Sequence, residues 1–410
     1  MSLRKQLNII DLLDRCWHNI YSSKQKTKRK YSKGSDGISI QDFQDTERIY
    51  LPSLQKNLEG EKYTLAPLGW FLEEKQEKGK FRLIIVFDVK DRIVHKAILS
   101  LINPDLFSYI DTKVSYCGVK LDIWKKRDNN SLNTKKAFLK IIYHLKNKKY
   151  FVFKSDIKGF YDNVPKKKLI KILRNLFQDL LKDTSLMKII EELIYFKITN
   201  PEKLKGDEKK YLPAKGKGIP QGSSLSQFFA NIYLADFDIK MQEKYGDRFI
   251  RYIDDFAVFC DSKDEAKEAK NYAIELLKEK ELELSEDPNK TKIADLKKDY
   301  INFLGLRIDS QKLTYKRNVA ETGKHIKEIL NEKSKAYTKY PKLSDKVNIM
   351  KDRIKGLGEY LKFYHTEAIY QEINKWVKDK RRKRAFNELE LLAVEKIKPI
   401  ISQKDWQALF

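Results

Sequence analysis

The sequence predicts an α+β fold, in which helices back a sheet and a helical segment follows toward the C-terminus. Between about 150 and 310, short runs of β-branched and aromatic residues alternate with longer amphipathic stretches, which is typical of strands and helices packed in layers. Beyond 311 the strand pattern fades, and apolar residues recur at helical spacing in a lysine-rich background. We therefore expect three parts, at residues 1–100, 101–310 and 311–410.

The individual elements can be placed by their residue patterns. In the first hundred residues, amphipathic helical patterns surround one strand-like run, FRLIIVFDV at 81–89, which indicates a hairpin at the rim rather than in the core. Three further runs indicate strands, namely KYFVFKSD, RFIRYIDDFAVFC and YINFLGLRID. The stretch LSQFFANIYLADFDIKMQEKY indicates a helix, and a small helical bundle is expected beyond 311.

The charge balance indicates a polyanionic partner. Lysine and arginine number 84 against 58 aspartates and glutamates, which leaves a formal charge of +26 and favours nucleic acid. No run approaches the roughly 18 apolar residues that span a bilayer, and the N-terminus lacks the layout of a signal peptide, so we expect a cytoplasmic protein without a membrane partner. Cys16, Cys117 and Cys260 are too few and too widely spaced for a zinc site or a disulfide scaffold.

Two adjacent carboxylates lie where a pair of strands is expected to turn. In RFIRYIDDFAVFC, Asp254 and Asp255 separate two apolar runs, so the turn would present both side chains at one edge of the sheet. Ionised neighbours with little water around them repel each other, and a divalent cation is the usual compensation. An ordinary acidic turn explains this hairpin as well when it is considered alone.

A third carboxylate is placed by the same reasoning. The apolar run KYFVFKSD ends at Asp156, and the aromatic pair Phe160 and Tyr161 follows, so this acid can meet the other two across neighbouring strands. Magnesium binds carboxylate and phosphate oxygens and keeps several waters. Two such ions, with Mn²⁺ as a substitute, would stabilise the attacking and the leaving oxygen of a phosphoryl transfer.

The order of these motifs resembles that of reverse transcriptases. Asp156, the run GIPQGSSLSQ at 218–227 and the Y-x-D-D sequence at 252–255 follow each other as in that family. Four more segments are similar to motifs of its bacterial branch: GSDGISIQDF (34–43), FRLIIVFDVKDRIVHKAI (81–98), DPNKTKI (287–293) and INFLGLRI (301–308). The resemblance implies a right-hand polymerase. Its N-terminal region and fingers would be residues 1–100, its palm, with fingers insertions and an antiparallel sheet backed by helices, residues 101–310, and its helical thumb residues 311–410.

The resemblance also implies roles for the acids and for one aromatic residue. Asp156 and Asp254 would be the principal ligands of two Mg²⁺ ions, with Asp255 assisting and the backbone of Ile157 completing the site. Tyr161 matches the position where a bulky ring excludes the ribose 2′-hydroxyl and favours deoxynucleotides. A buried core aromatic is the competing interpretation of Tyr161.

Further residues match positions that hold the nucleotide or the primer. Gln221 would pack against the incoming nucleotide and Gly222 would allow a close backbone approach, although a plain turn and helix cap explains both. Arg82 would hold the triphosphate, or be a solvated hairpin charge. Lys290 would act near the leaving pyrophosphate as a general acid or electrostatic stabiliser, with Lys292 as its competitor. The primer-grip turn would be formed by Phe303, Leu304 and Gly305, which also suit a strand that closes the sheet.

Comparison within the family narrows the kind of enzyme. Retron enzymes usually carry V-T-G at 303–305, mutagenic diversity-generating enzymes usually replace Gln221, and group II intron proteins continue into further segments. The chain is therefore most similar to stand-alone, defence-associated bacterial reverse transcriptases. This implies an RNA template, expected to be a dedicated non-coding RNA, together with dNTPs and a DNA product, and it is compatible with an oligomer.

Four alternatives stay open. The protein could be a template-independent DNA polymerase of the abortive-infection type, or a reverse transcriptase derived from a retron or a group II intron. An RNA polymerase with a similar palm is disfavoured by Tyr161 and by Tyr252-Ile253 before the acid pair. A non-catalytic RNA-binding protein of the same fold is disfavoured because all three acids are present.

Overall fold

The computed structural model describes most of the chain up to residue 316. The described residues are 2–24, 31, 33–75, 79–110, 114–116, 129–304, 306–310 and 315–316. They belong to two compact units, one with residues 1–25 and 29–304 and the other with residues 26–28 and 305–410. In the second unit β8 (Leu306–Ile308) pairs antiparallel with β9 (Tyr315–Lys316). Within 311–410, where a helical thumb was predicted, Tyr315 and Lys316 form a strand, and the other residues lie outside the described ones.

Helices make up most of the described part of the first unit. They are α1 (Leu3–Leu7), α2 (Ile10–Lys24), α3 (Ile40–Asp45), α4 (Glu47–Glu59), α5 (Val89–Ile110), α6 (Asn129–Lys146), α7 (Phe160–Asn163), α8 (Lys166–Asp179), α9 (Met187–Ile194), α10 (Ser224–Tyr245) and α11 (Lys263–Glu279), with the short 3-10 helices η2 (Pro201–Lys203), η3 (Gly206–Tyr211) and η4 (Gly246–Arg248). Within the described ranges, no helix combines the length and the apolar character needed to cross a membrane.

The strands of the first unit form one hairpin and one larger sheet. The hairpin pairs β1 (Gly69–Glu74) with β2 (Phe81–Val86). The four-stranded sheet has the order β4-β5-β3-β6, made of β3 (Phe151–Asp156), β4 (Phe249–Tyr252), β5 (Asp255–Cys260) and β6 (Lys292–Asp295), all antiparallel. A short strand, β7 (Ile301–Phe303), contacts β5. The predicted α+β fold with a helix-backed antiparallel sheet is confirmed.

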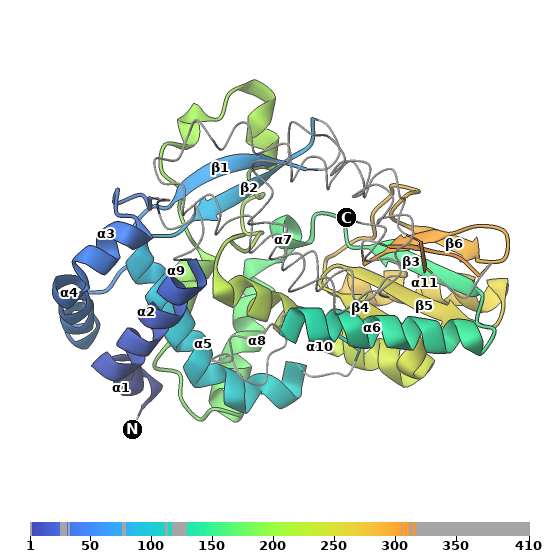
Figure 1. Cartoon of the computed structure of the whole chain (residues 1–410), viewed down its shortest axis with the longest axis horizontal. Coiled ribbons are helices and arrows are strands. Elements are labelled where there is room, and N and C mark those ends of the chain that lie inside the picture. Colours follow the sequence, from blue (N-terminus) through green and yellow to red (C-terminus); the bar gives the residue numbers. More distant parts are fainter. Residues whose placement is uncertain are drawn as a thin grey trace, which may run out of the picture. The chain divides into compact units, whose positions relative to one another are not determined.

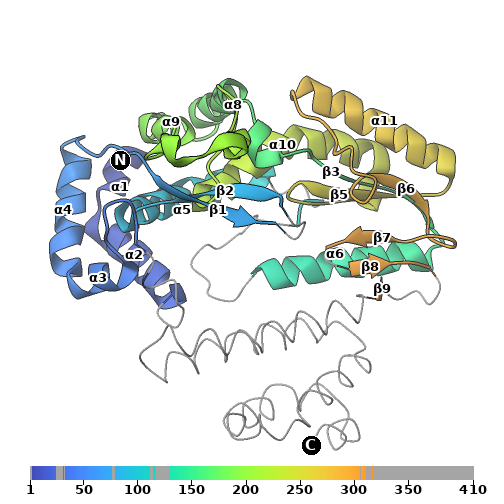
Figure 2. The same ribbon diagram turned by 90° about the horizontal axis from the view of Figure 1, so that it is seen from above.

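Helices lie on both faces of the four-stranded sheet. Helix α11 contacts β3, β5 and β6, and Figure 2 shows it on one side of the sheet with α6 on the other. The hairpin β1-β2 lies apart from this sheet, beside the N-terminal helices α1 to α4 (Figure 1). The palm-like sheet and the fingers-like hairpin are thus separate layers of one unit.

Helix α10 is the central element that connects these layers. It contacts α5, α8 and β4, and apolar side chains on all its sides, including Phe228, Phe229, Leu234 and Phe237, are buried. A helix that is apolar all round is stable only when it is enclosed by other elements. Its first turn is capped by Ser223, whose side chain accepts a hydrogen bond from the Leu225 amide.

The hairpin β1-β2 is more deeply embedded than the sequence predicts. Leu83, Ile85 and Phe87 are each at most 4% exposed and belong to the main core, so the prediction of a rim position for 81–89 was wrong for this face of β2. The reason is the alternation of the strand, which turns every second residue inward. In addition, the Ile85 amide donates to the Gln221 carbonyl at 2.9 Å, which ties β2 to the loop before α10.

The N-terminal motif GSDGIS is attached to the end of β2 through one buried carboxylate. Asp88 accepts hydrogen bonds from the Ser35 amide (2.7 Å), the Ser35 hydroxyl (2.9 Å) and the Asp36 amide (3.3 Å). A β-carbon at Gly34 would lie 2.4 Å from the Asp88 carboxylate. The glycine is therefore required by the close approach of this loop to Asp88.

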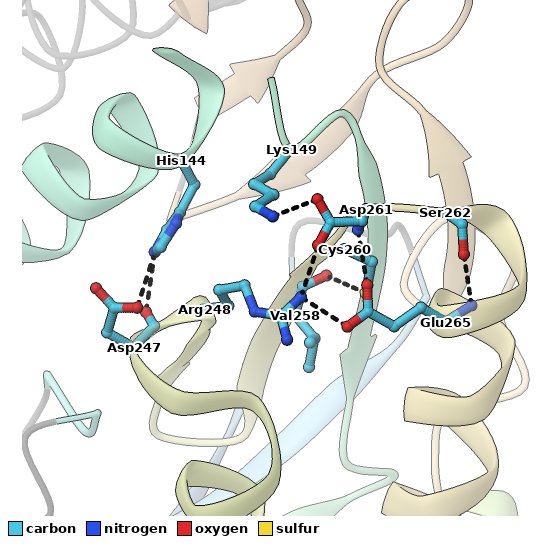
Figure 3. Close-up of polar contacts among 9 residues, drawn as sticks. All are labelled: His144, Lys149, Asp247, Arg248, Val258, Cys260, Asp261, Ser262 and Glu265. Atoms are coloured by element: carbon cyan, nitrogen blue, oxygen red, sulfur yellow. Dashed lines mark hydrogen bonds and ion pairs between the residues drawn. The ribbon is translucent and has the colours of Figure 1, made fainter. Parts of the chain in front are cut away.

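A polar cluster fixes the end of the sheet opposite to the acid pair (Figure 3). Arg248 lies 2.6 Å from Glu265 and 3.5 Å from Asp261, which also binds Lys149. On the other side His144 Nε2 lies 3.0 Å from the Asp247 carbonyl, and burial lowers the pKa of His144. The cluster joins α6, η4, β5 and α11 around the point where Phe151 pairs with Cys260.

Candidate active site

The two acids at 254 and 255 lie at a tight turn between β4 and β5. Tyr252 pairs with Asp255, so only Ile253 and Asp254 form the turn, and Ile253 has φ of 61°. A positive φ at the first central residue is typical of a type II′ hairpin turn, a position that favours glycine. A β-branched residue there is strained by about 1–3 kcal/mol, so surrounding contacts must hold the turn.

A buried arginine supplies these contacts. Arg251 Nη1 donates to the Ile253 carbonyl at 2.6 Å, and its remaining nitrogens bind both carboxylate oxygens of Asp238 (2.6 and 2.5 Å) and the Asn231 side chain (3.1 Å). Arg251 and Asp238 are both 0% exposed. From the other side, the Ile157 amide donates to the Asp254 carbonyl at 2.9 Å. The turn is thus fixed to α10 and to the end of β3.

The third acid lies next to the turn by strand register. Asp156, the last residue of β3, is the antiparallel partner of Asp255. Burial raises the pKa of Asp156, and burial together with the charge of Asp156 raises the pKa of Asp254 to about 6. The structure therefore brings the three predicted acids together in a site where their negative charge is poorly solvated.

Two lysines compensate part of this charge, and they differ in burial. Lys154 is buried, and its ammonium lies 2.7 Å from Asp255 Oδ1 and donates to the Lys290 carbonyl at 3.0 Å. Burial raises the pKa of Asp255 to about 7, against the opposing effect of Lys154. Lys290 is partly exposed and lies 3.7 Å from Asp156 Oδ2. Its competitor Lys292 instead lies 3.2 Å from Asp299.

The residues expected to face the nucleotide follow directly after β3 and before α10. The Tyr161 carbonyl accepts from the Ile219 amide at 2.8 Å, and the half-buried Tyr161 ring lies edge-on to Phe160. Gln221 Nε2 donates to Asp162 Oδ1 at 3.3 Å. At Gly222 φ is +140°, and a β-carbon would lie 2.3 Å from the Ile85 carbonyl oxygen, so only glycine fits between this loop and β2.

Two cations of the hairpin region have different neighbours: Arg82 pairs with an acid of the hairpin, whereas Lys75 lies near the acids of the site. Arg82 pairs across the hairpin with Glu73, with 2.7 Å between Nε and Oε2 and about half of each side chain exposed. Exposed pairs of this kind are weak, so Arg82 can exchange Glu73 for another anion. Lys75 lies close enough to Asp156 and Asp162 to oppose the rise that burial causes in the pKa of both.

The expected primer-grip residues are described only in part. Phe303 is buried at the end of β7, and Leu304 has a positive φ of 54°, which is uncommon for a residue other than glycine. Gly305 lies outside the described residues.

The acids could hold metal ions with the help of a substrate. Among the residues that the structure describes, no three His, Cys, Asp or Glu side chains form a ready-made cage, and Asp255 is bound to Lys154. Magnesium is usually bound by one or two carboxylates together with substrate phosphates. Asp156 and Asp254 fit this mode, because burial raises the pKa of both and the charge of Asp156 raises the pKa of Asp254 further.

Four residues at the site were missed by sequence reasoning. They are Lys75, Lys154, Asp238 and Arg251. A usable signal existed for three of them, because a charged residue inside an apolar strand or helix is almost never buried unless it is paired. Lys154 lies in the run FVFKSD, Arg251 in FIRY and Asp238 in LADFD, and each stands among apolar residues. No comparable signal marks Lys75, which lies in a polar stretch.

Comparison with known proteins relates this chain to one family. The family model described as reverse transcriptase (RNA-dependent DNA polymerase) matches residues 73–308. A COX1/OXI3 intron 2 protein of Saccharomyces cerevisiae is 24% identical over 232 residues, covering 56% of this chain and 24% of that protein. Protein YkfC of Escherichia coli is 24% identical over 321 residues, covering 70% of this chain and 79% of its own length. The chain thus spans about a quarter of the yeast protein.

Two solved structures contain chains that are similar to this one. A partial Cas6-RT-Cas1–Cas2 complex has a TM-score of 0.36 at 23% identity, covering 68% of this chain and 42% of the other. Apo telomerase from Candida tropicalis has a TM-score of 0.41 at 15% identity, covering 67% of this chain and 54% of the other.

Proposed function

Because this chain belongs to the reverse transcriptase family, we propose that it is an RNA-directed DNA polymerase whose reaction centre is formed by Asp156, Asp254 and Asp255. The observation that carries the proposal is the pairing of Asp156 with Asp255 beside the strained turn, which gathers three carboxylates at the ends of β3, β4 and β5. Lys290, 3.7 Å from Asp156, adds a cation on the exposed side.

The charges of the site suit nucleotidyl transfer. Asp156 and Asp254 would hold Mg²⁺, or Mn²⁺ in its place, together with the triphosphate of a dNTP. Two bound divalent ions supply charge stabilisation to the attacking and leaving oxygens. Lys290 would stabilise the negative charge that develops on pyrophosphate, and Lys154 would keep Asp255 in place by neutralising it.

The sugar and base of the nucleotide would be bound by the loop residues next to these acids. Tyr161 follows Asp156 by five residues, and its carbonyl accepts a hydrogen bond from the Ile219 amide, which supports a role for its ring in excluding a ribose 2′-hydroxyl.

Replacing it, as Tyr161→Ala, should raise incorporation of ribonucleotides relative to deoxynucleotides. Arg82, Gln221 and Gly222 would form the rest of the nucleotide site, and Phe303, Leu304 and Gly305 the primer grip.

Primer extension on a defined RNA template tests the activity. Wild-type protein with Mg²⁺ and dNTPs should extend a DNA primer, and Asp254→Ala/Asp255→Ala should abolish extension. Asp207→Ala, an aspartate with 97% of its side chain exposed, serves as the control and should retain full activity. Preference for rNTPs would instead assign an RNA polymerase, and product formed without template a terminal transferase.

We also propose that the template is a dedicated non-coding RNA and that the enzyme acts in bacterial anti-phage defence in the cytoplasm. The net charge of +26 supports a stable RNA partner, and the FLG sequence at 303–305 differs from the usual retron motif. Sequencing of co-purified RNA and of the DNA product tests this. One RNA species copied into the product supports the proposal, whereas a mixture of cellular RNAs contradicts it.

A further inference from the structure

A shallow basic groove lies on the surface between α8 and α9. Its volume is about 330 Å³, and its lining includes Lys167, Lys171, Arg174, Glu191 and Tyr195. Three cations against one carboxylate leave the lining with an excess of positive charge. Tyr195 is 46% exposed, and the Lys166 ammonium lies 5.6 Å from the centroid of its ring, so the groove combines cations with a partly exposed aromatic side chain.

The cations follow one row of α8. Lys167, Lys171 and Arg174 are spaced by four and three residues, which places them on one face of the helix, whereas Leu169 and Leu173 are buried. Successive positions four residues apart rise by about 6 Å along a helix. The row can therefore contact successive groups of an extended polyanion.

The two lysines of this row differ from their neighbours in lacking acidic partners. Arg174 is bound to Glu191 at 2.7 Å, and Lys168 lies 3.0 Å from Glu281. Within the part of the chain that the structure describes, Lys167 and Lys171 pair with no carboxylate. The first turn of α8 also contains no acid, although the helix dipole disfavours cations there. An anionic partner would neutralise the unpaired lysine charges and would interact favourably with the N-terminal end of the helix dipole.

We propose that this groove binds a single-stranded RNA segment, with phosphates on Lys167 and Lys171 and one base against the Tyr195 ring. Cations interleaved with an exposed aromatic ring are the chemistry that binds single strands without reading their sequence. RNA is the polymer that the proposed reaction brings to this protein. The groove goes beyond that reaction, because it is built by α8 and α9 and not by the strand ends that carry the acids.

The test separates binding in the groove from polymerase activity. Affinity is measured without dNTPs for two ligands, a short primer–template duplex and the same duplex with a long single-stranded RNA extension. Lys167→Gln/Lys171→Gln is compared with Lys263→Gln/Lys278→Gln, which removes two exposed lysines from α11. Melting temperatures of both variants check folding, and extension of the short duplex checks that the reaction centre is intact.

The groove variant should lose about tenfold in affinity for the extended ligand at about 0.1 M salt, and its salt slope should fall by about 1.4, since each single-strand phosphate contact contributes about 0.7. The short duplex and the α11 control should change less than about twofold. Tyr195→Ala should weaken the extended ligand and leave the salt slope unchanged. Equal binding of the extended ligand by the groove variant and the α11 control overturns the proposal.

Discussion

The most consequential single residue outside the acids is Arg251, because it holds the strained turn on which Asp254 lies. A buried ion pair adds little net stability compared with apolar residues of similar volume. The pair with Asp238 is instead suited to positioning, since its geometry leaves Nη1 directed at the Ile253 carbonyl at 2.6 Å. The side chain thereby fixes the direction of the turn without contacting the reacting groups.

Arg251→Met should therefore affect both stability and turnover. Removing one partner leaves Asp238 buried and unpaired, which should lower the free energy of unfolding by about 3–5 kcal/mol. Arg251→Met/Asp238→Leu should recover most of that stability in urea denaturation. It should not recover kcat, because the Ile253 carbonyl still lacks its donor. Recovery of kcat in the double variant would show that the arginine acts only through stability.

The pKa of Asp254 predicts how the stability of the metal-free protein depends on pH. Its pKa is raised from 3.8 to about 6, so between these values the folded state binds more protons than the unfolded state. Stability should fall as pH rises through this window and level off above it. Asp254→Asn should be more stable than wild type by on the order of 3 kcal/mol at pH 8 and equal to it near pH 3. Thermal melts at both pH values, without divalent ions, measure this, and a variant less stable at pH 8 would contradict it.

The same pKa values predict the pH dependence of magnesium binding. Mg²⁺ needs ionised carboxylates, and the pKa of Asp254 is raised to about 6 and that of Asp255 to about 7. Mg²⁺ should therefore raise the melting temperature more at pH 8 than at pH 5. In Asp254→Asn this difference should become smaller, because of the two acids only Asp255 then titrates between these pH values. An equal shift at both pH values would indicate that the ion binds elsewhere.

At the scale of elements, the attachment of β2 to the loop before α10 positions the hairpin over the site. The attachment consists of the hydrogen bond from the Ile85 amide to the Gln221 carbonyl and of the absence of a side chain at Gly222. Both are backbone features, so they depend on the conformation of residues 218–223 rather than on any one side chain.

Gly222→Ala should separate β2 from this loop. Its β-carbon would lie 2.3 Å from the Ile85 carbonyl oxygen, which cannot be relieved without moving backbone. We expect a loss of stability of about 2–4 kcal/mol and a rise in KM for dNTPs. Gly216→Ala is the matched control, because its φ is also positive, at 79°, but its β-carbon would meet nothing within 4 Å. The control should lose only about 1 kcal/mol.

Sequence patterns predicted the elements well where periodicity decides them. Strands β2, β3, β4 and β5 occur within the predicted runs, and helix α10 begins one residue before its run, because their apolar spacing is strict. Strand β6 was not predicted, since its four residues Lys292–Asp295 carry two charges and form a strand only by pairing with β3. The burial of β2 was also missed, because a single sequence does not show what packs against a strand.

The order of the motifs along the chain was sufficient to predict the three acids of the site, but not the residues that bind them. Lys154 reaches Asp255 because Asp156 and Asp255 are opposite each other, so Lys154 is a diagonal neighbour on the same face. A register shifted by one residue would direct Lys154 to the other face. That register is set by tertiary packing, and no local pattern of residues encodes it.

At the scale of the whole molecule, the net charge of +26 should govern how the protein associates with nucleic acid. Binding that depends on phosphate contacts weakens linearly with the logarithm of salt concentration. Affinity for a primer–template duplex should fall at least tenfold between about 50 and 200 mM salt. Fluorescence anisotropy over that range measures the slope, and an affinity independent of salt would contradict an electrostatic mode of binding.

Helix α10 has a consequence for building chimaeras with other family members. Its cap at Ser223 adjoins Gln221 and Gly222, and fifteen residues later Asp238 holds Arg251 and through it the acid turn. Helix α10 therefore fixes the distance, about 22 Å along its axis, between the nucleotide loop and the residue that holds the acid turn. A chimaera that exchanges only the loop before α10, or only the acid turn, would change the distance between them. Residues 218–260 are therefore the smallest segment that can be exchanged while this distance is kept.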